Sequence, residues 1–197
     1  TYGLTVRFGT SVRFLPFLGA IKEALVMAFS TSSSSATLPV TKGCCEDNLN
    51  VNPETTSFVL PLGATVNMDG TALYQGVAAI FIAQIYGMDL SMADQVTIVV
   101  SATLASVGAA GVPGAGMITL AMVLTAIGVP TEGLALILGV DRILDMFRTA
   151  TNVVGDSTAT VLMASLEGER LRIMSDAEDA ADPSKGFEGR LDHGQSA

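Results

Sequence analysis

A stripe of polar side chains follows one face of the last apolar segment of the chain, GVDRILDMFRTATNVVGDSTAT. At 100° per residue, a helix over this segment gathers them within an arc of roughly 100°. The residues are Asp141, Asp145, Arg148, Thr149, Asn152 and Asp156, with Arg142 at the edge of the arc. An amphipathic helix that turns this face to solvent is one alternative. The apolar run before it, GLALILGV, favours a membrane segment, where ionisable residues usually face a bundle interior or a pathway.

The residue types on this face predict a receptor for an acidic amino acid. Arg148 can present a planar pair of N–H donors to a carboxylate. Asp145, one turn earlier, can pair with an ammonium group, and Asn152, one turn later, can hold a second carboxylate.

A second polar cluster interrupts an apolar region at VNMDGTALYQ, residues 66–75. A buried carboxylate without a partner is costly, so this stretch is either a loop between two short strands or part of a binding site. Asp156, one turn beyond Asn152, is expected to face Asn67 and Asp69. Hard oxygen ligands without Cys or His suit an alkali cation rather than a transition metal.

Two segments of small residues, SSSS at 32–35 and GAAGVPGAG at 108–116, also interrupt apolar regions. Each is expected to present backbone N–H groups at the start of a half-helix, where the helix dipole favours anions. The glycine-rich segment differs from a phosphate-binding loop, because it lacks the P-loop lysine and its glycines have the reverse spacing of GxGxxG. A serine run taken alone is more typical of a linker.

The apolar segments predict an all-α membrane protein made of two corresponding units, residues 15–87 and 93–164. In each unit a re-entrant helical hairpin precedes a longer helix. We expect a hairpin over 15–47, a broken helix over 56–87 with half-helices 56–66 and 72–87, a hairpin over 93–128 and a last transmembrane helix over 131–164. Paired interrupted segments are typical of transporters with inverted repeats and a site at the membrane midplane.

The distribution of charge supports a membrane protein. No Lys or Arg lies between Lys42 and Arg142, and residues 95–131 carry no charge, a stretch longer than the roughly 20 residues that cross a bilayer. The buried core of a large soluble α/β protein is the alternative. The net charge of −9 arises largely near the ends, and nothing is basic enough to predict nucleic-acid binding.

The ends of the chain are expected to lie outside the main domain, residues 9–166. Residues 1–8 resemble the end of a transmembrane helix whose beginning is missing. Residues 167–197 are polar without apolar periodicity and are predicted to form a disordered tail, which contains the single histidine, His193. Cys44 and Cys45 are adjacent, so a disulfide between them would be strained.

Four stretches resemble the glutamate transporter family of dicarboxylate/amino acid:cation symporters: SSSSATLPVT, LPLGATVNMDGTALYQ, ASVGAAGVPGAG and DRILDMFRTATNVVGD. The resemblance covers residues 1–166 and is closest to bacterial members that share the serine run and a CCEDN-like segment with the animal excitatory amino acid transporters. It implies the transport core of a sodium-coupled symporter for aspartate or glutamate that moves by an elevator mechanism. It also implies sodium as the coupling ion without a cofactor, a multi-pass location in the cell (inner) membrane, and a homotrimeric full-length relative.

The resemblance also implies roles for individual residues. The implied substrate contacts come from both tips, the broken helix and the last helix, and are Ser33, Ser34, Thr71, Val112, Pro113, Gly114, Ala115, Gly116, Asp145, Arg148, Thr149 and Asn152. The second tip, Val112 to Gly116, is implied to close over the substrate as a gate. The implied sodium ligands are Gly63, Asn67, Asn152 and Asp156 for one ion, Thr65, Ser106, Val107 and Ala109 for a second, and Asn67 with Asp69 for a third.

The chain also departs from the family. Members carry an arginine at the first tip or in the last helix, where this chain has Ser32 and Met146, and Arg142 lies one turn before Met146. Alternatives are a neutral amino acid exchanger, against which the charge of Arg148 argues, and an inactive truncated membrane fragment without its scaffold. A serine hydrolase lacks support, because no histidine lies outside the tail and no Gly-x-Ser-x-Gly motif occurs. The choice between aspartate and glutamate, and coupling to protons or potassium, stay open.

Overall fold

The computed structural model describes residues 1–109 and 111–173, and in this part of the chain all regular secondary structure is helical, without a strand. The first half contains α1 (Tyr2–Gly9), α2 (Phe14–Ala20), α3 (Lys22–Thr31), α4 (Ser34–Gly43), the π-helix η1 (Cys44–Asn48) and α5 (Pro53–Val66). The second half contains α6 (Asp69–Ile85), α7 (Met92–Val107), α8 (Ala115–Ala126), the 3-10 helix η2 (Thr131–Leu134) and α9 (Ala135–Leu166). The all-α prediction is confirmed.

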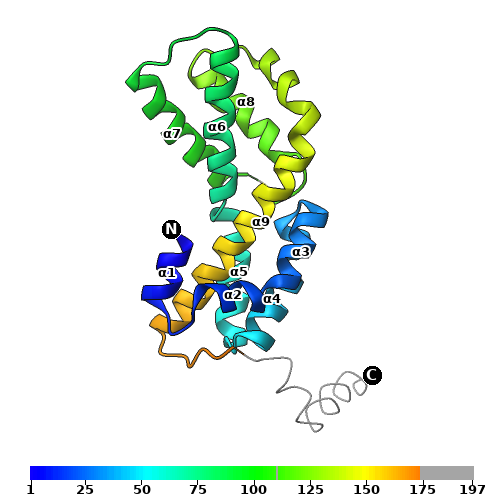
Figure 1. Ribbon diagram of the computed structural model, residues 1–197, viewed down its shortest axis with the longest axis vertical. Coiled ribbons are helices and arrows are strands. Elements are labelled where there is room, and N and C mark those ends of the chain that lie inside the picture. Colours follow the sequence, from blue (N-terminus) through cyan, green and yellow to red (C-terminus); the bar gives the residue numbers. More distant parts are fainter. Residues whose placement is uncertain (110, 174–197) are drawn as a thin grey trace.

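The helices form two groups that share α9 (Figure 1). The lower group in the view holds α1 to α5, the upper group holds α6 to α8, and the long α9 runs through both. α9 packs against α3 and α5 in the first group and against α6 in the second. One apolar core, with Phe17, Ile21 and Leu60, lies in the first group, and another, with Ile82 and Leu120, lies in the second.

Local sequence explains where several helices begin. Asn52 caps α5 by accepting a hydrogen bond from the Glu54 backbone N–H at 3.0 Å, and Pro53 occupies the first helical position, where no amide donor is needed. α7 begins with a capping box, in which Ser91 and Asp94 each accept a hydrogen bond from the other's backbone N–H. Ser33 caps α4.

The interruptions lie at the polar segments, and the structure shows their extent. Asn67 and Met68 alone separate α5 from α6, so Asp69, Gly70 and Thr71 of the predicted break already belong to α6. Ser32, at φ 54° in the left-handed region, and Ser33 separate α3 from α4. The predicted tip of the first hairpin is therefore these two residues, since α4 starts at Ser34.

The outer surface carries many large apolar side chains, among them Phe8, Leu15 and Leu166. Among the described residues, no single helix combines the length and apolar character needed to cross a membrane. The pair α2 and α3, bent by 63°, meets those criteria when its members are taken together.

The described part of the predicted tail, residues 167–173, lies beside residues 49–52. The Asn52 backbone N–H donates to Glu169 Oε2 at 2.8 Å, and the Arg172 N–H donates to the Leu49 carbonyl at 3.3 Å. Leu171 and Ile173 pack against the first core. Residues 174–197, with His193, and Ala110 in the second tip lie outside the described residues.

Candidate binding site

The two tips, the break between α5 and α6, and the middle of α9 enclose a small polar cavity of about 10 Å³. Most of the predicted substrate contacts line it, namely Ser34, Thr71, Val112, Ala115, Gly116, Asp145, Arg148, Thr149 and Asn152. Ser33, Pro113 and Gly114 are not among the lining residues. Ser32, Met68, Ala109 and Gly111 line the cavity as well, although sequence reasoning had not placed them at the substrate.

The polar face of α9 is buried rather than turned to solvent. Asp145, Arg148, Thr149, Asn152 and Asp156 are all buried. Their burial argues against the alternative in which this face is turned to solvent. Charged groups that are removed from water need partners within the protein. Arg142 is exposed, and its Nη2 donates to the Ser30 carbonyl at the end of α3 at 3.4 Å, outside the cavity lining.

Asp145 and Arg148 form a buried ion pair at the centre of the site, in which Arg148 Nη2 donates to Asp145 Oδ1. The other oxygen, Oδ2, accepts from the Gly114 backbone N–H at 2.9 Å, so Asp145 also anchors the second tip. Arg148 Nη1 is buried and has no hydrogen-bond partner among the described residues. A buried guanidinium nitrogen without a partner is unfavourable, which leaves Arg148 with a donor available for an anion.

Tyr74 of α6 supports the guanidinium from one side. Arg148 Cζ lies 5.1 Å from the centre of the Tyr74 ring, within the range of a cation–π interaction. The Tyr74 hydroxyl donates to Asp141 Oδ1 at 2.9 Å. Sequence reasoning placed Asp141 on the polar face but missed Tyr74, which stands in the same TALYQ stretch as Thr71. An aromatic residue one turn beyond the polar break was the available signal.

Asn152 ties α9 to the break. Its Oδ1 accepts from the Gly70 backbone N–H at 2.8 Å, and its Nδ2 lies 3.3 Å from Thr71 Oγ1 and 3.2 Å from the Met68 sulfur. The amide is therefore occupied on both sides by residues of the broken helix. Asn152 can orient Thr71 and Met68 toward the cavity while presenting little free hydrogen-bonding capacity of its own.

Three of the predicted cation ligands converge one turn further along α9. Asn67 Nδ2 donates to Asp156 Oδ1 at 2.9 Å. Gly63 approaches the same carboxylate so closely that a Cβ there would lie 2.8 Å from Asp156 Oδ1. Asp69 is exposed and accepts from the Tyr2 hydroxyl at 2.8 Å, a partner that sequence reasoning did not find. The expected proximity of Asp156 to Asn67 is thus present.

The second predicted group of cation ligands is less closely joined. Ala109 lines the polar cavity, and α5 and α7 touch. The hydroxyls of Thr65 and Ser106 each donate to a carbonyl of their own helix, at 2.9 Å and 2.8 Å. Val107 is exposed at the end of α7.

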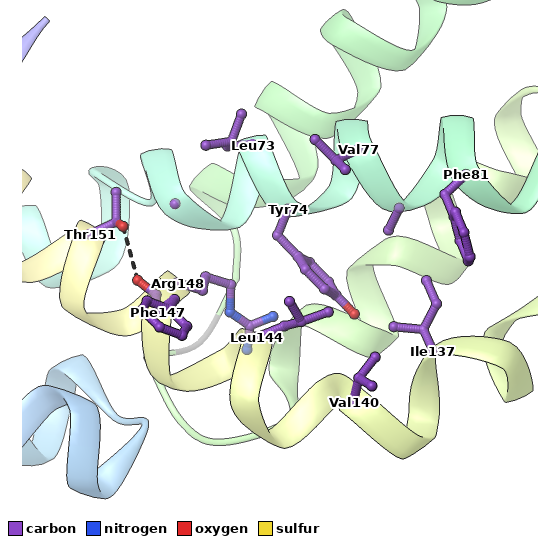
Figure 2. Close-up of a pocket in the computed structure, with 12 residues that line it drawn as sticks. Leu73, Tyr74, Val77, Phe81, Ile137, Val140, Leu144, Phe147, Arg148 and Thr151 are labelled. Carbon is purple, nitrogen blue, oxygen red and sulfur yellow. Dashed lines mark hydrogen bonds between the residues drawn. The ribbon is translucent and has the colours of Figure 1, made fainter.

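A larger cavity of about 430 Å³ lies between α6 and α9, on the apolar side of Arg148 (Figure 2). Leu73, Val77, Phe81 and Ile137 line it together with Tyr74. Its walls are almost entirely apolar, so it lacks the several polar groups needed to fix the orientation of an amino acid. The smaller polar cavity is the better candidate for such a ligand.

Comparison with known proteins gives one family and several relatives. The model of the sodium:dicarboxylate symporter family matches residues 1–166. Similar proteins are glt-4 of Caenorhabditis elegans, 55% identical over 80% of this chain, and excitatory amino acid transporter 4 of Rattus norvegicus, 53% identical over 80%. Excitatory amino acid transporter 1 of Ambystoma tigrinum is 52% identical over 82%. The aligned regions cover 32%, 28% and 30% of these relatives, so the chain spans about a third of their length.

Proposed function

Because the chain belongs to the sodium:dicarboxylate symporter family, we propose that it is the substrate- and cation-binding core of a sodium-coupled symporter for aspartate or glutamate. The observation that carries this proposal is the buried Arg148, whose Nη1 has no partner among the described residues and whose side chain lines a polar cavity. A fixed guanidinium at such a place selects a ligand carboxylate, since planar bidentate pairing is its strongest interaction.

The substrate is held by the residues around this guanidinium. The ligand's side-chain carboxylate pairs with Arg148, and its ammonium group pairs with Asp145, which it shares with the second tip. Thr149 of α9 and Thr71 of α6 hold the rest of the amino acid, and Asn152 orients Thr71 through the contact between its Nδ2 and Thr71 Oγ1 at 3.3 Å. Ser34 and the segment Val112–Gly116 bound the site from the two tips.

Sodium binds in this proposal around Asp156, with Gly63, Asn67 and the Asn152 backbone as its other ligands. The Asn67–Asp156 hydrogen bond at 2.9 Å and the close approach of Gly63 support this group. Asp69 with Asn67 forms a further cation site, and Thr65, Ser106, Val107 and Ala109 form another. Carboxylate, amide and carbonyl oxygens suit a hard monovalent cation.

In this proposal, the core belongs to a multi-pass protein of the cell membrane. The apolar outer surface supports contact with lipid or further helices, because so many exposed large apolar side chains are unusual for a soluble monomer. The two interrupted hairpins are re-entrant, and the core moves as an elevator against a scaffold in a trimeric assembly. The family resemblance supports these features.

A neutral amino acid exchanger fits the site less well. A neutral side chain would leave Arg148 Nη1 without a partner, and a buried donor without a hydrogen bond is unfavourable. The relatives are transporters by name, and none of these names describes an enzyme.

Substitution of Arg148 tests the proposal, with Arg142 on the same helix as the matched control. In the purified chain, titrated with aspartate in detergent and sodium, Arg148→Ala is expected to lower affinity at least about 100-fold, the value of two charged hydrogen bonds. Arg142→Ala removes an exposed guanidinium outside the cavity and is expected to leave affinity within a few-fold. A gain of affinity for neutral amino acids in Arg148→Ala would support the assignment.

Wild-type affinity for aspartate in Arg148→Ala would contradict the assignment of the carboxylate to this residue. A wild-type chain that fails to bind aspartate in sodium would favour the alternative of an inactive fragment.

A further inference from the structure

Ser33 has a different environment from its neighbours in the first tip. Ser32 and Ser34 line the polar cavity, whereas Ser33 does not. The Ser33 hydroxyl is buried and directed to the opposite tip, where it donates to the Gly111 carbonyl at 2.7 Å. The same oxygen atom of Ser33 accepts from the Ala36 backbone N–H at 3.2 Å, so both its donor and an acceptor position are used.

The Gly111 carbonyl is the point at which the two tips join. Besides the Ser33 hydroxyl, the Ser35 backbone N–H donates to it at 3.2 Å. The fit around Gly111 is close, because a Cβ there would lie 2.8 Å from Ser35 Oγ and 3.2 Å from the Ala64 carbonyl. Two donors from the first tip thus bind one acceptor of the second, while Gly114 is anchored separately on Asp145.

The cavity behind this junction is small. Its volume of about 10 Å³ corresponds to little more than one water-sized probe. An amino acid cannot enter a space of this size, and Arg148 lies directly against Gly116 on the second tip. Ligand entry therefore requires the tips to separate, and separation requires the Ser33–Gly111 hydrogen bond to break.

We infer that Ser33 is a positioning residue that holds the second tip closed through its hydroxyl, rather than a substrate ligand. The inference rests on the proposed function of the same cavity. The hydroxyl contributes to the closed state both before and after ligand binding, because neither its donor nor its acceptor contact involves the cavity. Loss of the hydroxyl shifts the balance of the tips toward the open arrangement and lets a bound ligand leave sooner.

Three variants separate the hydroxyl contact from the helix cap. Ser33→Gly removes the donor to Gly111 and keeps a residue that caps helices nearly as well as serine. Ser33→Thr keeps the hydroxyl at an extended position that suits a β-branched residue. Ser30→Ala, the control, removes an exposed hydroxyl of the same hairpin that donates only to the Val26 carbonyl of its own helix.

The distance between the tips is measured by electron spin resonance on the full chain in detergent without aspartate. Labels are placed at Ala36→Cys and Ile118→Cys, both at exposed positions outside the cavity lining. The native Cys44 and Cys45 are buried, so labelling is selective for the introduced residues. Ser33→Gly is expected to raise the ratio of open to closed distances about 2- to 10-fold, the range for one hydrogen bond, whereas Ser33→Thr and Ser30→Ala match the parent chain.

The rate of aspartate dissociation gives the second measurement. Ser33→Gly is expected to raise this rate about 2- to 10-fold, whereas Ser33→Thr is expected to keep the rate of the parent chain. Distances that are unchanged in Ser33→Gly would overturn the inference. An equal opening in Ser33→Thr or in Ser30→Ala would overturn it too, because general loosening would then explain the result. Failure of the parent chain to bind aspartate would count against the proposed function, whereas the distance measurement in the absence of ligand judges the role of Ser33 separately.

Discussion

Gly116 is the position at which a single methyl group displaces Arg148 without changing any charge. Gly116 is the second residue of α8, the helix that follows the second tip, and its backbone lies against the guanidinium. A Cβ at this position would overlap Nη1 and Cζ of Arg148. Carbon atoms need about 3.5–4.0 Å to a neighbouring heavy atom, so in Gly116→Ala the guanidinium must withdraw by about 2 Å.

A displacement of this size removes the geometry on which bidentate pairing depends. Hydrogen bonds to charged groups contribute about 1.5–3 kcal/mol each, so losing the pair of them to a ligand carboxylate costs about 3 kcal/mol or more. This corresponds to an aspartate affinity about 100-fold lower. The overpacked site also lowers the free energy of unfolding by about 1–3 kcal/mol.

The assay is calorimetric titration of aspartate into Gly116→Ala, with Gly139→Ala as the matched control. Gly139 lies within α9 and has no atom within 4 Å of the position that a Cβ would take. Its replacement is expected to leave affinity unchanged and to stabilise the helix by up to about 1 kcal/mol. An affinity in Gly116→Ala within threefold of the parent chain would refute the reasoning, because Arg148 would then bind no ligand from its present position.

Four further results are expected. Aspartate affinity rises with sodium concentration through linkage, and Asp156→Asn flattens this dependence; the measurement is titration in sodium against choline, and an unchanged parent affinity in choline contradicts it. At the exposed start of α7, hydrogen bonds from the Ser91 hydroxyl and backbone N–H lower the pKa of Asp94. Its contribution is therefore complete above the ordinary carboxyl pKa of about 3.9 and is lost as pH falls through the lowered folded pKa. Amide exchange in the first turn of α7 should accelerate over that acidic range, and Asp94→Asn should remove the step. Ser91→Ala should destabilise the helix by about 1 kcal/mol at neutral pH. Finally, the exposed apolar surface makes the chain aggregate without detergent, and a monodisperse monomer in plain buffer, seen by light scattering, would count against a membrane environment.

The sequence by itself predicted that the chain is helical and that the polar residues of the last helix share one face. Helical periodicity is a local property, so it placed Asp145, Arg148 and Asn152 on one face before any fold was known. Interruptions were also readable, because polar and small residues within apolar segments break helices or supply caps. These signals led to the two hairpins, the broken helix and the convergence of Asn67 with Asp156.

Only the tertiary structure decided which atoms of those residues are used, because the deciding contacts join residues far apart in the chain. Spacing could not show that the Ser33 hydroxyl reaches Gly111, 78 positions away, whereas Ser32 and Ser34 face the cavity. Nor could it show that Tyr74 lies beneath Arg148. Each side chain has several possible partners of suitable chemistry, and the packing of α6 and both tips against α9 selects among them by distance.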